Sequence, residues 1–328
     1  MLCYRSLMNR GPDGPILVTG ATGFLGPHVV AAAVAAARSE ATFADPEGFP
    51  VFAAGRSLDG CPSFCTPRNA AEEVSVDLLD EGVLERLVDA CKPAVWIHCA
   101  ALSRIADCAA QPELARRTNV DVPRGIAELC ARRDIRLVHV STDLVFGGAP
   151  SPKGGFREEQ PSAPLSVYGQ TKAEAETFVL QACPTALVVR LPLLYGDSGA
   201  RGLGASDSLL DAMQAEQVPP LFVDEFRCPL EVRDAAAALV ELACGDASGI
   251  LHVAGPDRVS RHELGLHILK AMGIEPKDGA AMVCEAGRAD APEPETRPGE
   301  LCLDSSRARA LLECPLHGVT SGTERAMT

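Results

Sequence analysis

The sequence of 328 residues has no apolar run as long as a membrane span and no internal repeat. Basic residues are in the minority, with 30 Lys and Arg against 44 Asp and Glu, so the net charge is −14. Nucleic acids and anionic membranes need a basic surface, and both are disfavoured as partners. The first 14 residues lack the apolar core of a secretory signal. We expect flexible ends at residues 1–14 and 316–328.

The thirteen cysteines are scattered along the chain. The pairs Cys61/Cys65 and Cys99/Cys108 lack further ligands at the spacing of a zinc site, so we expect no metal. A reducing, cytoplasmic compartment suits these thiols best. The acidic balance still allows an anionic small ligand, because a few local arginines are enough to bind one.

Residues 15–26, PILVTGATGFLG, predict a buried strand that turns into a helix. Gly20 permits the tight turn, Gly23 lets the backbone approach a pyrophosphate, and Gly26 allows close packing of helix on strand. The helix N-terminus then faces the anion. A tight turn without a ligand is the alternative, but the strand before and the helix after favour nucleotide binding.

The next strand, within FPVFAAGRS, ends at Gly55 and is followed by Arg56 and Ser57. NAD-selective sites usually carry an acid at this point, whereas an arginine accommodates a 2′-phosphate. NADP(H) is therefore favoured, and NAD(H) stays an alternative. Arg56 is an ordinary loop arginine if the long segment 39–50 shifts the alignment.

Further short strands end at Asp77, at His98 and in STD at residues 141–143, with helical segments between them. This alternation predicts an α/β fold with a doubly wound parallel sheet. Ligands bind beyond the carboxyl ends of such strands, so Asp77 and residues 99–101 are expected in the cofactor groove. Thr142 or Asp143 either binds substrate or caps the following turn.

Tyr168 and Lys172 lie four residues apart in VYGQTKAE, which reads as the first turns of a helix. Residues at this spacing share a face of any helix, so the pair alone proves little. A lysine ammonium beside a phenol favours the phenolate and lowers its pKa. Tyr168 could then act as an acid and base near neutral pH.

Taken in order, these pieces resemble the extended short-chain dehydrogenase/reductase superfamily and, within it, the dTDP-4-dehydrorhamnose reductase-like group. The resemblance covers about residues 15–310. It is carried by TGATGFLG, HCAA, Asn119 in RTNVD, STDLVFGG, YGQTK, VVRLPLLYG, RCPLEVRDAA and RPGELCLDSS.

The resemblance implies that Tyr168 is the catalytic acid and base and that Lys172 lowers its pKa and holds the nicotinamide ribose. Thr142 orients the carbonyl, and Asn119 supports the proton relay. Lowering a phenol pKa by about 3 units requires roughly 4 kcal/mol of differential stabilisation. The implied reaction is hydride transfer from NADPH to the C4 keto group of a nucleotide-linked 4-keto-6-deoxy sugar, with Tyr168 as the proton donor.

Pattern and resemblance together give two sets of binding residues. The cofactor set is Gly20, Thr22, Gly23, Phe24, Leu25, Gly26, Arg56, Ser57, Asp77, Leu78, Ala100, Ala101, Tyr168 and Lys172. The substrate set is Ser103, Asp143, Arg227 and Arg297, of which the two arginines suit a diphosphate but could equally be structural.

Two positions depart from the rhamnose-forming pattern, which commonly has aromatic residues where this chain has Leu144 and Leu193. RLPLLYG is closer to the regulatory beta subunit of methionine adenosyltransferase, which binds NADP and acts through a partner enzyme. A non-catalytic regulatory subunit is therefore the rival interpretation. A sugar epimerase with tightly held NAD is disfavoured by Arg56 and by RPGELCLDSS.

We expect residues 15–195 to form the nucleotide-binding domain and residues 196–315 a smaller substrate lobe, some of whose segments return to the sheet. His252, His262 and His267 have no metal-like partner set and are expected to be ordinary packing or surface residues. Members of the superfamily often pair through two helices beside the active site, here those around Asn119 and Tyr168. A homodimer is the corresponding expectation.

Overall fold

The computed structural model describes residues 14–39, 48–56, 71–199, 203–291 and 297–327. Seven strands form one parallel sheet in the order β11-β6-β5-β4-β1-β2-β3. Their bounds are β1 Ile16–Thr19, β2 Val51–Gly55, β3 Glu72–Ser75, β4 Val95–His98, β5 Arg136–Thr142, β6 Leu187–Leu191 and β11 Gly249–His252. The doubly wound α/β class predicted from the sequence is confirmed.

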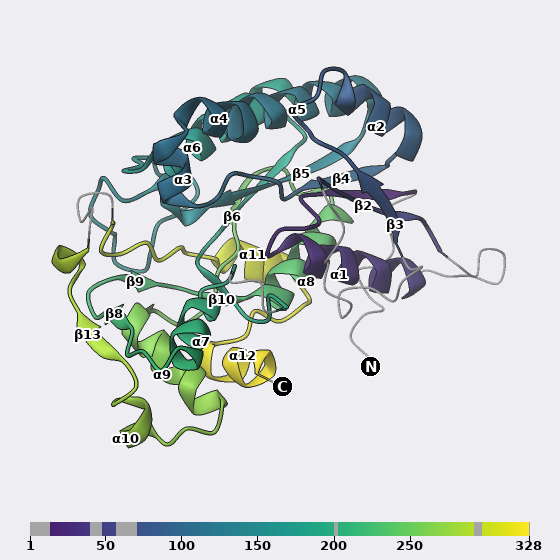
Figure 1. The fold of residues 1–328 in the computed structure, drawn as a ribbon. Coiled ribbons are helices and arrows are strands. Elements are labelled where there is room, and N and C mark those ends of the chain that lie inside the picture. Colours follow the sequence, from purple (N-terminus) through teal and green to yellow (C-terminus); the bar gives the residue numbers. More distant parts are fainter. Residues whose placement is uncertain (1–13, 40–47, 57–70, 200–202, 292–296, 328) are drawn as a thin grey trace.

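Helices cover both faces of the sheet (Figure 1). One face carries α1 (Gly26–Ser39), α8 (Val232–Ala243) and α11 (Ser306–Leu311), and the other carries α2 (Val83–Cys91), α5 (Val122–Arg133) and α6 (Val167–Ala182). Successive strand residues point to opposite faces, so Ile16 and Val18 pack under α1 while Leu17 packs under α5. The central strands β1, β4 and β6 are buried along their whole length and mostly apolar, whereas the edge strand β3 (EEVS) is largely exposed.

The order of the strands reverses between β1 and β4, because the chain moves outward from β1 to β3 and then returns to β4. The carboxyl ends of these two strands form the crevice where such sheets bind ligands. Short turns follow this edge: α3 (Ile105–Ala110), α4 (Pro112–Arg116), the π-helical turn η2 (Arg117–Asp121) and the 3₁₀ turn η3 (Asp143–Val145).

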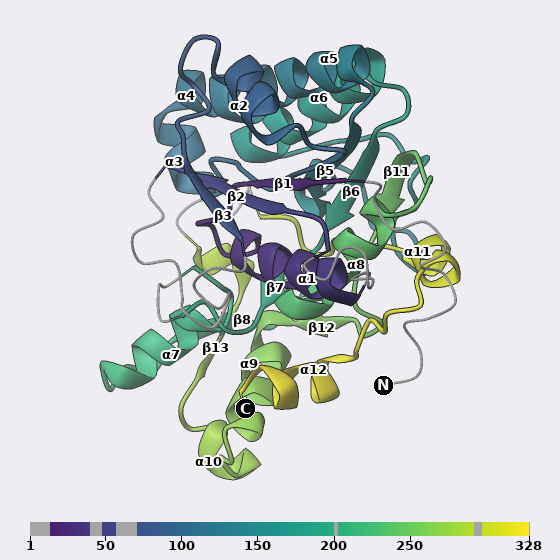
Figure 2. The same cartoon turned by 90° about the vertical axis from the view of Figure 1, so that its right-hand side faces the viewer.

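The second half forms a smaller lobe on the side of α1 and α8 (Figure 2). Its core contains Tyr195, Leu209, Leu264, Ile268 and Leu269. The helices of the lobe are α7 (Asp207–Gln214), α9 (Arg261–Ala271), α10 (Pro276–Gly279), the 3₁₀ turn η4 (Arg288–Asp290) and α12 (Val319–Ala326). Three strand pairs join it: β7 (Leu194–Tyr195) with β10 (Leu230–Glu231), β9 (Phe226–Arg227) with β12 (Val259–Ser260), and β8 (Pro220–Phe222) with β13 (Cys284–Ala286).

The chain was expected to be flexible from residue 316 onward. Instead, residues 319–326 form helix α12, which packs on α9 and β10. Val319 and Thr323 are buried there. Asp234 of α8 fixes the approach to this helix, because its carboxylate accepts hydrogen bonds from His317 N and Arg325 Nη1. These partners are some 80 to 90 residues apart in sequence, so local pattern gave no sign of them.

Within the described residues, no helix combines the length and apolarity needed to cross a membrane.

Candidate active site

The glycine loop brings the ends of β1 and β4 together. Gly20 has φ +82°, and a Cβ at this position would lie 2.5 Å from Ala100 N. Only glycine permits both the positive φ and this close approach. The other predicted residues of the loop lie at the same edge of the sheet. Gly23 is exposed, Thr22 and Phe24 are half-buried, and Leu25 and Gly26 are buried. The sequence-predicted strand–turn–helix is therefore present, with its turn at the point where the strand order reverses.

The ends of β2 and β3 lie next along this edge. Arg56 is exposed directly after β2, and Ser75 Oγ donates a hydrogen bond to its carbonyl oxygen. Asp77 Oδ1 accepts a hydrogen bond from Leu79 N, so this carboxylate shapes the turn that carries Leu78. Ser57 lies outside the described residues.

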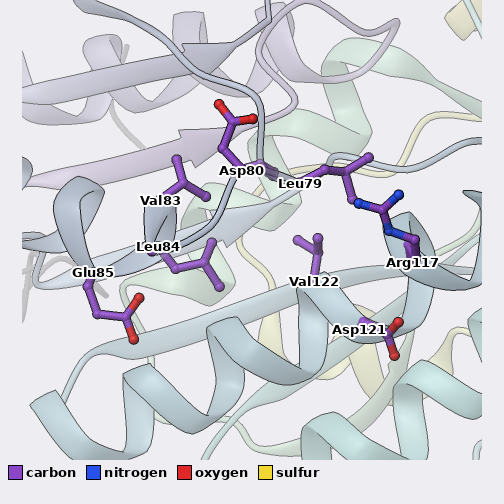
Figure 3. A pocket seen from close by; sticks show the side chains of 10 residues that line it. Leu79, Asp80, Val83, Leu84, Glu85, Arg117, Asp121 and Val122 are labelled. Atoms are coloured by element: carbon purple, nitrogen blue, oxygen red, sulfur yellow. The ribbon is translucent and has the colours of Figure 1, made fainter.

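A cavity of about 250 Å³ adjoins this turn, and Arg117 and Asp121 of η2 form its far wall (Figure 3). Leu78 is the member of the predicted cofactor set that lines it. Tyr168, Lys172 and Thr142 do not line it. The cavity therefore adjoins the β3 side of the predicted groove and is separate from the predicted reaction centre.

Asn119 is fully buried in the π-helical turn η2, a geometry that is frequent at functional sites. Its Oδ1 accepts a hydrogen bond from Leu102 N at 2.8 Å, and its Nδ2 donates to Leu102 O at 3.0 Å and to Thr171 Oγ1 at 3.1 Å. The side chain thus ties the loop after β4 to helix α6. That loop contains the half-buried Ala100 and Ala101 and the exposed Ser103.

Helix α6 presents a polar row, Tyr168, Lys172 and Glu176, at the i, i+4, i+8 positions of one face. Ser166 caps the start of the helix by accepting a hydrogen bond from Gly169 N at 3.1 Å. This fixes the first turn, which carries Tyr168, against the carboxyl end of β5. Each residue of the row meets a different partner there.

Tyr168 is half-buried and lies beside Thr142. Burial raises the pKa of Tyr168, and the negative charge of Asp143 raises it further, whereas the interaction with the Thr142 hydroxyl lowers it. The predicted juxtaposition of Tyr168 and Thr142 is present. The predicted lowering of the Tyr168 pKa by Lys172 is wrong for this structure, in which burial dominates.

Lys172 explains part of that result, because its ammonium group turns toward β5. Nζ donates a hydrogen bond to Val140 O at 2.7 Å and lies 3.2 Å from His139 Nε2. His139 in turn stacks on His98, with ring centroids 5.5 Å apart. Burial lowers the pKa of Lys172 to about 8, which Glu176 and Cys99 partly oppose. A lysine that titrates near 8 can exchange a proton close to neutral pH.

Glu176 makes a buried bidentate ion pair with Arg190 of β6, at 2.9 and 2.7 Å. Ser141 Oγ donates to the same carboxylate at 2.5 Å. Arg190 also lies 3.2 Å from His252 Nε2 on β11 and stacks over the ring of Phe146. This network joins α6 to three strands and holds the helix in place behind the site.

Asp143 faces the substrate lobe. Its Oδ2 lies 3.6 Å from Arg227 Nε, and its pKa is raised to about 6 because burial outweighs the attraction of that guanidinium. Arg227 is buried and donates to Phe226 O and Pro298 O. Glu225 pairs with both Arg227 and Arg297, at 3.4 and 3.1 Å. Arg227 therefore connects its own strand β9 to the segment around Pro298. Arg297 is more exposed than Arg227.

Arg261 is a member of this cluster that sequence reasoning missed. Its charge interacts with Glu225, Arg227 and Arg297, and burial lowers its pKa. Its Nη1 is buried and has no hydrogen-bond partner among the described residues. Arg261 begins helix α9 and reads in sequence as an ordinary first-turn residue, so no signal pointed to the site. Among the described residues, this cluster holds three arginines against two carboxylates.

The RmlD substrate binding domain family matches residues 14–328. The chain belongs to this family. A probable low-salt glycan biosynthesis reductase of Haloferax volcanii is 30% identical over 299 residues, which cover 90% of this chain and 92% of that protein.

Two further relatives differ in what their names describe. The methionine adenosyltransferase 2 subunit beta of Xenopus laevis is 34% identical over 205 residues, covering 61% of this chain and 60% of that protein. A dTDP-4-dehydrorhamnose reductase of Bacillus anthracis, solved in complex with NADP, has a TM-score of 0.74 at 21% identity and covers 96% of this chain and 98% of that one. The last likeness shows the shared fold.

Proposed function

We propose that the protein is an NADP(H)-dependent reductase of a nucleotide-linked 4-keto-6-deoxy sugar. The observation that carries this proposal is the placement of Tyr168, on the first turn of α6, beside Thr142 at the carboxyl end of β5. Both hydroxyls lie at the edge of the sheet that also carries the glycine loop. A carbonyl placed between them meets one group that orients it and one that can give it a proton.

Tyr168 keeps its proton at neutral pH and can donate it to the alkoxide that forms as the carbonyl is reduced. The raised pKa makes it a weaker acid than an ordinary tyrosine, but an alkoxide is a stronger base than a phenolate, so the proton still moves to the alkoxide. Bound NADPH would supply the hydride. The cofactor set at the ends of β1, β2 and β3 would hold it, with exposed Arg56 placed to meet a 2′-phosphate.

The three arginines gathered among the described residues of this cluster support a nucleotide diphosphate as the part of the substrate that binds there. Arg297 and Arg261 are the members with the least complete sets of partners, since Arg227 is engaged by two carbonyl oxygens and two carboxylates. A guanidinium matches the geometry of phosphate oxygens. Binding of the diphosphate would position the sugar at Tyr168.

The test is NADPH consumption, followed at its absorbance, with a panel of nucleotide-linked 4-keto sugars. We expect turnover by the wild type and a loss of 10²-fold or more in Tyr168→Phe, as is typical of a missing general acid. Tyr195→Phe is the matched control, because that hydroxyl is buried in the lobe core. If the protein binds NADPH but reduces none of these sugars, the proposal that it is a reductase is wrong.

The rival function is a regulatory subunit that binds NADP and acts through a partner enzyme. Two observations favour it: the relative from Xenopus laevis, and the pocket positions Leu144 and Leu193, where rhamnose-forming reductases commonly have aromatic residues. The test is co-elution with a methionine adenosyltransferase catalytic subunit on size exclusion. Stable co-elution by a protein without sugar reductase activity would favour the regulatory function.

The expected homodimer would use the outer face of α5 and α6. That face carries the ion pairs Arg116–Glu174 and Arg124–Glu128, which are exposed in the single chain. A polar, charged face resembles the rim of an interface more than its apolar core. Light scattering of the purified protein decides between monomer and dimer.

A further inference from the structure

Two cysteines of the substrate lobe lie opposite each other on neighbouring chain segments. Phe226 and Glu300 form a parallel bridge, in which Leu301 N donates to Phe226 O at 3.1 Å and Phe226 N donates to Gly299 O at 2.7 Å. Two residues further along each segment stand Cys228 and Cys302. Side chains two residues apart point to the same side of an extended chain, so the register places these thiols face to face.

The two thiols belong to one apolar cluster. Cys228 and Cys302 are 7% and 5% exposed and share this cluster with Phe146 and Phe156. They lie near enough for each thiol to shift the pKa of the other. Both sulfurs are free thiols.

The two thiols have different pKa values. Interaction with the Cys302 thiol is the largest cause of a lowered pKa at Cys228, and it outweighs burial and the nearby carboxylates of Asp143 and Glu300. The pKa of Cys302 is raised by the interaction with Cys228 and by burial. The thiolate is the reactive form of cysteine, so Cys228 is the more reactive member.

We propose that Cys228 and Cys302 form a peroxide-sensitive dithiol, with Cys228 as the nucleophile and Cys302 as the resolving thiol. In the first step the Cys228 thiolate attacks an oxygen of hydrogen peroxide. The O–O bond breaks, hydroxide leaves and takes up a proton, and Cys228 becomes a sulfenic acid. In the second step Cys302 attacks that sulfur, an S–S bond replaces the S–O bond, and water leaves with the Cys302 proton.

The disulfide would join the two segments that carry Arg227 and Arg297. Cys228 follows Arg227, and Cys302 lies five residues after Arg297. The ion pair of Glu225 with Arg297 already connects these segments reversibly. Oxidation would make the connection covalent, and a thiol reductant would release it. The inference does not depend on whether the protein is a reductase or a regulatory subunit.

The chain contains its own control pair. Cys130 and Cys183 are both buried in the cluster beneath α5 and α6, close enough for their charges to interact. Burial raises the pKa of Cys130, in contrast to the lowered pKa of Cys228. Exposed Cys284 controls for access by the oxidant.

The test treats the folded full-length protein with equimolar hydrogen peroxide, blocks free thiols, and maps disulfides by mass spectrometry without reduction. We expect a Cys228–Cys302 peptide as the main cross-link, its loss on adding dithiothreitol, and a melting temperature raised by several degrees in the oxidised form. Cys302→Ser should stop at a sulfenic acid on Cys228 that dimedone traps, and Cys228→Ser should give no dimedone adduct on Cys302.

Two results would overturn the proposal. The first is that oxidised wild-type protein contains no Cys228–Cys302 disulfide, and the second is that a Cys130–Cys183 disulfide forms as fast as the Cys228–Cys302 disulfide. Mapping of the wild type decides the matter even if a variant fails to fold.

Discussion

At the scale of single residues, the network behind α6 shows how a buried charge depends on its partner. Glu176 and Arg190 are 4% and 2% exposed, and each satisfies the other. Arg190→Leu would leave the carboxylate buried without a cation. We predict a loss of about 3 to 5 kcal/mol in the free energy of unfolding, measured in urea.

The control for this prediction is the exposed pair Arg124–Glu128, whose side chains are 54% and 44% exposed. Arg124→Ala should cost less than about 1 kcal/mol, because water already screens that pair. A similar loss of unfolding free energy in both variants would show that the buried ion pair contributes no more to stability than the exposed one.

Lys172 predicts a pH dependence of stability. Its pKa in the folded protein is about 8, against an ordinary value of 10.5. Between these pH values the unfolded chain keeps a proton that the folded protein has released, so the lysine makes stability rise with pH. Below pH 8 both states are protonated, and the cost of burying the ammonium is fully present.

Comparison with Lys172→Met isolates this effect, because methionine carries no charge. We expect the stability of the variant relative to the wild type to fall by about 3 kcal/mol from pH 8 to pH 10.5, following the size of the pKa shift. Urea unfolding at several pH values measures it. An exposed lysine, Lys153, provides the control variant Lys153→Met. A difference independent of pH would show that Lys172 titrates normally.

Arg56 tests the choice of cofactor. If its guanidinium binds a 2′-phosphate, Arg56→Ala should weaken NADPH binding by roughly 10- to 100-fold, as for a lost charge-assisted hydrogen bond. NADH binding should hardly change, because NADH lacks that phosphate. Fluorescence titration with both nucleotides gives the two affinities, and equal weakening of both would reject the role.

At the residue scale, the sequence placed Tyr168 on a helix and Thr142 at the end of a buried strand. Their meeting at one site was predicted from the family resemblance, because spacing alone left Thr142 open as a cap of the following turn. The direction of Lys172 could not, because it depends on Val140 O and His139 across space. Arg227 and Arg261 show the same limit, since burial and pairing are set by distant segments.

At the scale of elements, α12 shows what local pattern leaves out. The strands were predictable because buried apolar runs bounded by glycine and polar residues identify them. The final helix has few apolar residues and is held by Asp234, Asp257 and the core of the lobe. These hydrogen bonds and packing contacts are made by residues far away in the chain. The sequence after residue 316 therefore predicts a flexible end when it is considered alone.

The packing of α12 gives a prediction by double-mutant cycle. A Cβ on Gly322 would lie 2.0 Å from the hydroxyl oxygen of Tyr195, which has no hydrogen-bond partner among the described residues. Gly322→Ala should therefore cost about 1 to 3 kcal/mol by overpacking, in spite of the better helix propensity of alanine. In Tyr195→Phe the same substitution should cost clearly less. Additive effects in thermal unfolding would show that α12 does not pack here.

At the scale of the whole molecule, residue 195 does not separate two independent units of the fold. Segments from the second half of the chain pack on the sheet that the first half begins. Helix α8, from the second half, packs on α1 and contributes Val232, Ala235 and Leu239 to the core on that face of the sheet. Strand β11 pairs with β6 and completes the sheet. The sheet and the helices that cover it are therefore built from both sides of residue 195.

A fragment of residues 14–195 tests this dependence. Without α8 and β11 it would expose one face of α1 and an unpaired edge on β6, and both favour aggregation over folding. We expect the full chain to unfold in one calorimetric transition and the fragment to show none. Co-expression with residues 203–328 should recover a folded complex, because the missing helix and strand are then supplied. A cooperative transition in the fragment alone would mean that the sheet needs neither element, and the division at residue 195 would then be a true domain boundary.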